Sequence, residues 1–143
     1  MAIRIVPPKI ERIPLIESDK RYGAEGTYVD VRRASVEDHE RRSAFFRNYT
    51  ERVTPEGALE VDYSLPIYEM MWLELEMCLA GCNIEDENGN SLIVFENGKV
   101  KDSNQMRRAL RGLQDPELLT EMHEAVLSVN SMWAMKGKVK VGE

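Results

Sequence analysis

The sequence has only two cysteines and two histidines among its 143 residues. The cysteines, Cys78 and Cys82, lie four residues apart, and no second pair exists to complete the four ligands of a structural zinc site. A disulfide between them would close too short a loop to add much stability. We therefore predict that both thiols are small, buried apolar groups.

Metal-binding motifs are missing as well. His123 and Glu124 begin as a zinc-protease motif does, but the second histidine would fall at the position of Leu127. A calcium loop starting at Asp86 is excluded, because Ser91 stands where such a loop requires glycine. We expect no metal and no cofactor.

No motif of a catalytic nucleophile is present, nor is a glycine-rich phosphate loop. The glycines within residues 23–26 lack the lysine and the hydroxyl residue that complete such a loop. The neighbouring carboxylates Glu85, Asp86 and Glu87 lie in a turn, where solvation is expected rather than acid–base chemistry. The sequence therefore gives no indication of an enzyme.

A basic surplus is also missing, since the formal net charge is -6. This charge argues against a protein that binds nucleic acid through a generally positive surface. No basic segment followed by an apolar run opens the chain, and no apolar stretch reaches the ~20 residues of a membrane span. We expect a cytoplasmic protein that has no contact with a membrane.

The most apolar stretch of the chain, residues 64–81, predicts a helix that is buried on most sides. Ser64 is a good N-cap, Pro66 fits the first turn, and Gly81 marks the expected end. The side chains expected to face water are those of Glu69, Glu74 and Glu76.

Two segments before this helix alternate in polarity as strands do. Residues 2–6 predict a short first strand, and residues 27–33 predict a half-buried strand with Val29 and Val31 on one face. Residues 9–26 between them show little periodicity. We expect one domain, with residues 1–26 as a strand plus a loop or mobile arm, residues 27–136 as the globular body, and residues 137–143 as a frayed tail.

Three further helices are expected around the central one. Ser35 and Asp38 form a capping box that starts the first of them, which runs to about Tyr49 or Val53 and carries His39 on an exposed face. A loop over residues 54–62 follows. The overall class expected is α+β, mainly helical, with about four helices, a small N-terminal β element and a short hairpin at residues 88–89.

The last two helices have clear start signals. Asp102 or Ser103 caps a helix that reaches about Leu113, after a turn at residues 97–98. Asp115 followed by Pro116 starts a helix that we expect to run to about residue 136. Its apolar stripe is expected to pack on the central helix.

The order of these features resembles that of the tail assembly chaperones of long-tailed phages and their prophage relatives. The matching marks are a strand that leads into a polar helix at residues 27–38, then an apolar helix, then an Asp-x-x-Gly turn followed by apolar residues and phenylalanine at residues 86–95. A pair of C-terminal helices, here residues 104–113 and 116–136, completes the pattern. The likeness covers roughly residues 27–135.

This resemblance implies a mostly helical protein that binds the tape measure protein, keeps that long apolar chain soluble and helps to recruit tail-tube subunits. Such a chaperone acts in the host cytoplasm and is not retained in the finished virion. Two alternatives remain open: a structural component of the tail or of the head–tail connector, and a small nucleic-acid-binding regulator. The sequence also leaves open whether the chain forms a homo-oligomer.

The family pattern contains no catalytic motif, so no functional residue is carried over from it. A helical client is best held in apolar grooves between helices, for which aromatic and methionine side chains are suited. The candidate contact residues are Phe45, Phe46, Tyr49, Met132 and Trp133, with a polar rim of Arg107, Arg108 and Arg111.

Overall fold

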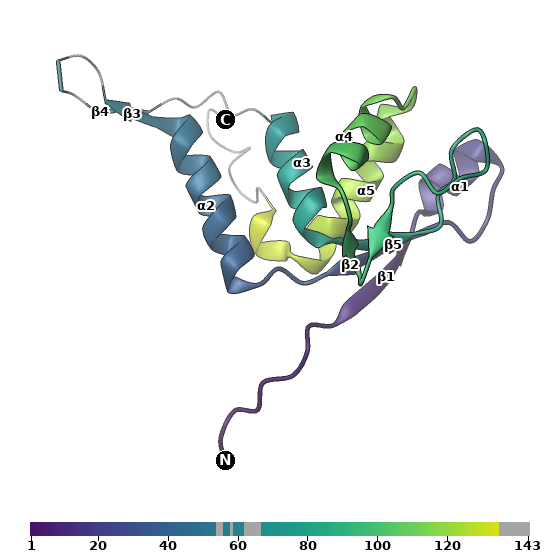
Figure 1. Ribbon diagram of the computed structural model, residues 1–143, viewed down its shortest axis with the longest axis horizontal. Helices are drawn as coiled ribbons and strands as arrows, with labels where there is room; N and C mark the ends of the chain where they lie inside the picture. Colours follow the sequence, from purple (N-terminus) through teal and green to yellow (C-terminus); the bar gives the residue numbers. More distant parts are fainter. Residues whose placement is uncertain (54–55, 58, 62–66, 135–143) are drawn as a thin grey trace, which may run out of the picture.

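The computed structural model describes residues 1–53, 56–57, 59–61 and 67–134. Within these residues the chain forms five α-helices, one three-stranded antiparallel sheet and two short two-stranded hairpins (Figure 1). This is the mainly helical α+β class that the sequence predicts. Helices α3 (Ile67–Cys78) and α5 (Pro116–Val129) and the sheet enclose the core.

The sheet has the order β1-β2-β5, with β1 at Ile10–Pro14, β2 at Tyr28–Arg32 and β5 at Leu79–Cys82. Val29 and Val31 are fully buried, which confirms the alternation expected for β2. The first strand, however, is not at residues 2–6. Alternating polarity shows that a segment can form a strand, but it does not show which segment will pair with it. In the structure β2 pairs with residues 10–14.

A short helix, α1 (Ile16–Tyr22), connects β1 to β2. The expectation of a loop or mobile arm over residues 9–26 is therefore wrong. Leu15 is fully buried, and the backbone N–H and hydroxyl of Ser18 both donate to the carboxylate of Glu121 on α5. Seven residues are too few to give a clear helical period, so the sequence pattern does not reveal this element.

Helix α2 (Val36–Thr50) begins with the expected capping box. The Asp38 N–H donates to the Ser35 hydroxyl at 3.1 Å, and the Ser35 N–H donates to the Asp38 carboxylate at 3.0 Å. His39 is not on an exposed face as expected, because its Nδ1 accepts a hydrogen bond from the Trp133 indole at 3.0 Å. Strand β3 (Glu51–Val53) directly follows α2, so the helix ends before Val53, and β3 pairs with β4 (Leu59–Val61), which lies in the segment expected to be a loop (Figure 1).

The central helix, α3, spans Ile67–Cys78. Gly81 does not end it as expected, since the chain turns into β5 at Leu79 and Gly81 pairs with Asp30 of β2. A Cβ at Gly81 would lie 3.2 Å from the Asp30 carboxylate, so glycine suits this close strand contact. The expected cap at Ser64 and the proline at Pro66 lie outside the described residues.

The exposure of α3 also differs from the expectation at its start and in its middle. Glu74, expected to face water, is 2% exposed and binds Arg42 of α2 and His123 of α5. Ile67 and Tyr68, expected to be buried, are 70% and 61% exposed. The helix therefore buries a charge and shows an apolar surface near its start.

Two hairpin turns precede the last helices. Gly89, with φ of 80°, closes the expected turn after Asp86, and Asn97 and Gly98 have φ of 54° and 73° between β6 (Phe95–Glu96) and β7 (Lys99–Val100). Asparagine and glycine tolerate this left-handed conformation better than other residues do. Both turns were predicted from their Asn-Gly sequence.

Helices α4 (Ser103–Arg111) and α5 (Pro116–Val129) start as predicted. Asp102 and Asp115 each accept hydrogen bonds from two backbone N–H groups of the first turn. Helix α5 ends earlier than the expected residue 136: Asn130 caps it, and a 3₁₀ turn, η1 (Ser131–Trp133), follows. None of the helices that the structure describes is long and apolar enough to cross a membrane.

The two thiols occupy different environments. Cys78 is fully buried, as predicted, whereas Cys82 is only half-buried. Burial raises the pKa of Cys78 from 9.0 to about 12. The folded protein therefore holds the Cys78 proton more tightly than the unfolded chain does, and this difference stabilises the fold fully only below the unfolded pKa.

We expect the free energy of unfolding to fall as the pH rises above 9.0 toward about 12, because the unfolded chain then loses the Cys78 proton first. Urea unfolding at several pH values in this range measures the slope of the free energy of unfolding against pH. The matched control is Cys78→Ala, which should lose less stability per pH unit than the wild type. Parallel slopes for the two proteins would contradict the prediction.

Candidate partner-binding site

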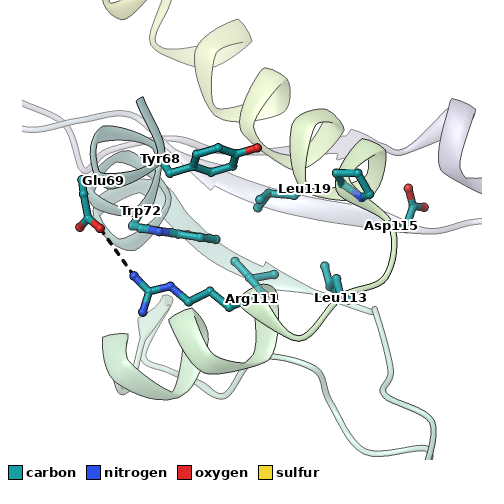
Figure 2. Close-up of a pocket in the computed structure, with 9 residues that line it drawn as sticks. Tyr68, Glu69, Trp72, Arg111, Leu113, Asp115 and Leu119 are labelled. Carbon is teal, nitrogen blue, oxygen red and sulfur yellow. Dashed lines mark ion pairs between the residues drawn. The ribbon is translucent and has the colours of Figure 1, made fainter. Parts of the chain in front are cut away.

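An open hollow lies between α3, α4 and the start of α5 (Figure 2). Its volume is about 350 Å³. The walls are mainly apolar and come from Leu110 and Leu113 of the α4 end, and from Pro116 and Leu119 of α5. Residues 112–115, which connect α4 to α5, lie at the edge of the hollow.

Two aromatic residues of α3 form the other wall. Tyr68 and Trp72 lie one helical turn apart, so their side chains share a face, and their ring centroids are 6.5 Å apart. Trp72 is 3% exposed and Tyr68 is 61% exposed. Figure 2 shows both rings projecting from α3 toward Leu119. Trp72 therefore forms a fixed wall, while Tyr68 stands at the rim with most of its ring in water.

Charges lie at two edges of the hollow. The Arg111 guanidinium is 3.6 Å from the Glu69 carboxylate and 5.5 Å from the centre of the Trp72 ring (Figure 2). Both charged side chains are about half exposed, so this pair contributes little to stability. At the other edge Asp115 caps α5 and binds Arg21 at 2.8 Å, which lowers the pKa of Asp115 and keeps it negative at neutral pH.

This arrangement is suited to holding apolar side chains of another protein. An exposed aromatic ring beside apolar walls, with a rim of opposite charges, is the usual composition of a protein interface. Among the described residues, no group of three or more histidines, cysteines, aspartates or glutamates could hold a metal ion. Of the charged side chains at the hollow, Asp115, Arg111 and Glu69 are already paired with one another or with Arg21.

A second, larger hollow of about 830 Å³ lies between α1, the turn at residues 83–91 and α4. Its polar groups are largely engaged within the protein. The Asp86 carboxylate accepts from the N–H groups of Asn88 and Asn90, and the Gln105 amide bonds the backbone of Leu92 and Val94. We therefore regard the first hollow, where the rings of Tyr68 and Trp72 lie together, as the better candidate.

The three arginines expected to form one polar rim lie in three different places. Arg111 lies at the first hollow and Arg108 lines the second. Arg107 is half-buried and binds the Glu76 carboxylate at 3.2 Å, which Arg41 of α2 also binds at 3.1 Å. The structure therefore assigns only Arg111 to the candidate site.

The aromatic and methionine candidates are also separated. Trp133 is 3% exposed, and Phe45 is half-buried against the core. Arg42 lies 5.2 Å from the Phe46 ring and 5.1 Å from the Trp133 ring, which joins these two residues in a structural cluster. Met132 is 75% exposed on η1. The Tyr49 side chain lies outside the described part of the structure.

Sequence reasoning did not select Tyr68 and Trp72 because it assigned nearly the whole helix to the core. Their four-residue spacing indicates a shared face, but exposure depends on which neighbours cover that face. Comparison of the chain with protein-family models, curated proteins and solved structures finds no match to any of them.

Proposed function

We propose that this protein is a tail assembly chaperone of a long-tailed phage or prophage, which binds the tape measure protein and keeps it soluble. The observation that carries the proposal is the exposed Tyr68 ring beside the apolar hollow of Trp72 and Leu119. The resemblance of the element order to that family supplies the identity of the client. The protein is not an enzyme in this proposal.

The site supports a helical client in particular. The hollow is open and is bounded by α3, α4 and the start of α5, so it can accept side chains from one face of a further helix. Tape measure proteins are long helical chains with apolar faces, according to the same resemblance. Arg111 and Glu69 at the rim offer one charge of each sign to the polar border of such a helix.

Tyr68→Ala tests this site directly. We expect the variant to reduce the amount of co-purified tape measure protein about tenfold or more, because an aromatic side chain that becomes buried against the client contributes about 2 kcal/mol to binding. The measurement is affinity purification of the tagged chain after co-expression with the tape measure protein of the same phage. The fold should persist, since the Tyr68 side chain is mostly in water.

Arg108→Ala is the control, because Arg108 is exposed on α4 and lines the second hollow but not the first. It should co-purify the client as the wild type does. If Arg108→Ala loses the client and Tyr68→Ala retains it, the binding site is the second hollow and our assignment is wrong. Mass spectrometry of purified particles adds a separate test, since a chaperone should be missing from them and a structural tail component should be present.

A further inference from the structure

The N-terminal arm, residues 1–9, is the most exposed apolar segment of the molecule that the structure describes. Ile3, Ile5 and Val6 are 92%, 88% and 69% exposed. All nine residues are described, and they adopt no helix or strand. In Figure 1 the arm leaves β1 and runs away from the body.

The arm has the sequence of a strand but cannot pair with its own β1. Residues 2–6 alternate in polarity, with Ile3 and Ile5 on one side and Arg4 on the other. To fold back on β1, the chain would need a tight turn over residues 7–9. Val6 and Pro7 each precede a proline and are therefore held extended, which directs the arm away from the sheet.

β1 is an edge strand with an available side. Within the part of the chain that the structure describes, β1 pairs only with β2. The Leu15 N–H donates to the Thr27 carbonyl, so the alternation of an antiparallel pair directs the backbone groups of Ile13 and Glu11 toward β2. The N–H groups of Ile10 and Arg12 then point outward, where they can donate hydrogen bonds to the carbonyl groups of another strand.

The apolar face of the arm, Ile3 and Ile5, suits the face of β1 that carries Ile13, and Glu11 shares that face. Ile13 on β1 pairs with Val29 on β2, and both contribute to the core side. On the opposite face Arg12 binds Asp30 at 2.9 Å. A strand added beside β1 would continue the apolar layer with Ile3 and Ile5, and Arg4 would join the charged layer.

We propose that the arm of one chain adds as a fourth strand to the outer edge of β1 in a second copy of this chain. Exchange of arms in both directions gives a dimer with two-fold symmetry, in which each arm covers the edge of the other sheet. The proposal does not depend on the chaperone function. The strand that receives the arm belongs to a second copy of the chain, because the arm cannot fold back onto its own β1.

The test is the mass of the full chain in solution, measured by size-exclusion chromatography with light scattering. At about 100 µM the wild type should have twice the chain mass of 16.4 kDa, since a dimer of micromolar affinity is then formed. In a dilution series, the double variant Ile3→Glu/Ile5→Glu should need about tenfold or more higher concentration than the wild type to be half dimeric. The matched control, Val36→Glu/Met132→Glu, adds the same charge at exposed residues outside the arm and should remain dimeric.

Ile10→Pro tests the edge separately. It removes an outward N–H at the first residue of β1, where proline is tolerated, and should give a folded monomer. Thermal unfolding shows whether each variant keeps its fold. A wild type that is monomeric at about 100 µM would overturn the proposal. An arm variant or an Ile10→Pro variant that dimerises over the same concentrations as the wild type would overturn it as well.

Discussion

Replacing Glu74 by alanine should lower the free energy of unfolding by about 3–5 kcal/mol, because a buried ion pair that loses one partner leaves the other charge uncompensated. The Glu74 side chain is 3% exposed and that of Arg42 is 14% exposed. Their Nε and Oε2 atoms are 2.6 Å apart.

The environment of Arg42 makes this pair costly to break. Its Nη2 donates to the Trp133 carbonyl at 3.3 Å, and its guanidinium lies against the rings of Phe46 and Trp133. The second oxygen of Glu74 binds His123 Nε2 at 2.6 Å. Glu74 therefore connects α3 to both α2 and α5, and its removal loosens both contacts.

Urea unfolding monitored by circular dichroism measures the effect. The matched control is Glu69→Ala on the same helix, whose ion pair with Arg111 is half exposed and should contribute less than about 1 kcal/mol. Replacing both members of the buried pair, as in Glu74→Leu/Arg42→Met, should recover part of the loss. Equal effects of Glu74→Ala and Glu69→Ala would show that Glu74 is not buried as described.

Asn130→Ala should destabilise the fold by about 2–4 kcal/mol, since each buried polar group that loses its partner costs about 1–3 kcal/mol. Asn130 is 4% exposed. Its amide oxygen accepts from the Ala34 N–H at 2.8 Å, and its amide nitrogen donates to the carbonyls of Arg32 and Val126. One side chain thus connects the end of α5 to the segment between β2 and α2.

Thermal or urea unfolding of Asn130→Ala gives the size of this effect. Asn104→Ala provides the comparison, because Asn104 is exposed on α4 and should change stability by less than about 0.5 kcal/mol. A loss below about 1 kcal/mol at Asn130 would mean that its hydrogen bonds are replaced by water.

Local signals in the sequence predicted the elements that depend on local chemistry. The capping box at Ser35, the caps at Asp102 and Asp115 and the Asn-Gly turns all lie where their residue types indicate. These features involve residues that are near in the chain, so the sequence contains most of the information needed. The α+β class followed from the same elements.

The structure differs from the sequence prediction where a residue or strand far along the chain determines the local conformation or burial. Glu74 is buried because Arg42 and His123, each about thirty or more residues away, neutralise and bind it. β1 is set by its pairing with β2, and β5 replaces the end of the central helix because β2 offers it an edge. Helix α5 stops at Asn130 because that side chain bonds to residues 32 and 34.

The candidate site also combines a residue that the sequence predicted with one that only the packing of distant helices reveals. Arg111 was selected from the sequence as an outward residue of its helix, and it lies at the hollow. Tyr68 was not selected, because its exposure reflects how α4 and α5 pack beside α3 and leave its ring uncovered. The spacing of Tyr68 and Trp72 gives their shared face but not the hollow in front of it.

The most direct test of the proposed function is the solubility of the tape measure protein when it is expressed with and without this chain. The account predicts that the client sediments when expressed alone, remains in the supernatant with the wild-type chain, and sediments again with Tyr68→Ala. A client that is insoluble in the presence of the wild-type chain would contradict the chaperone proposal.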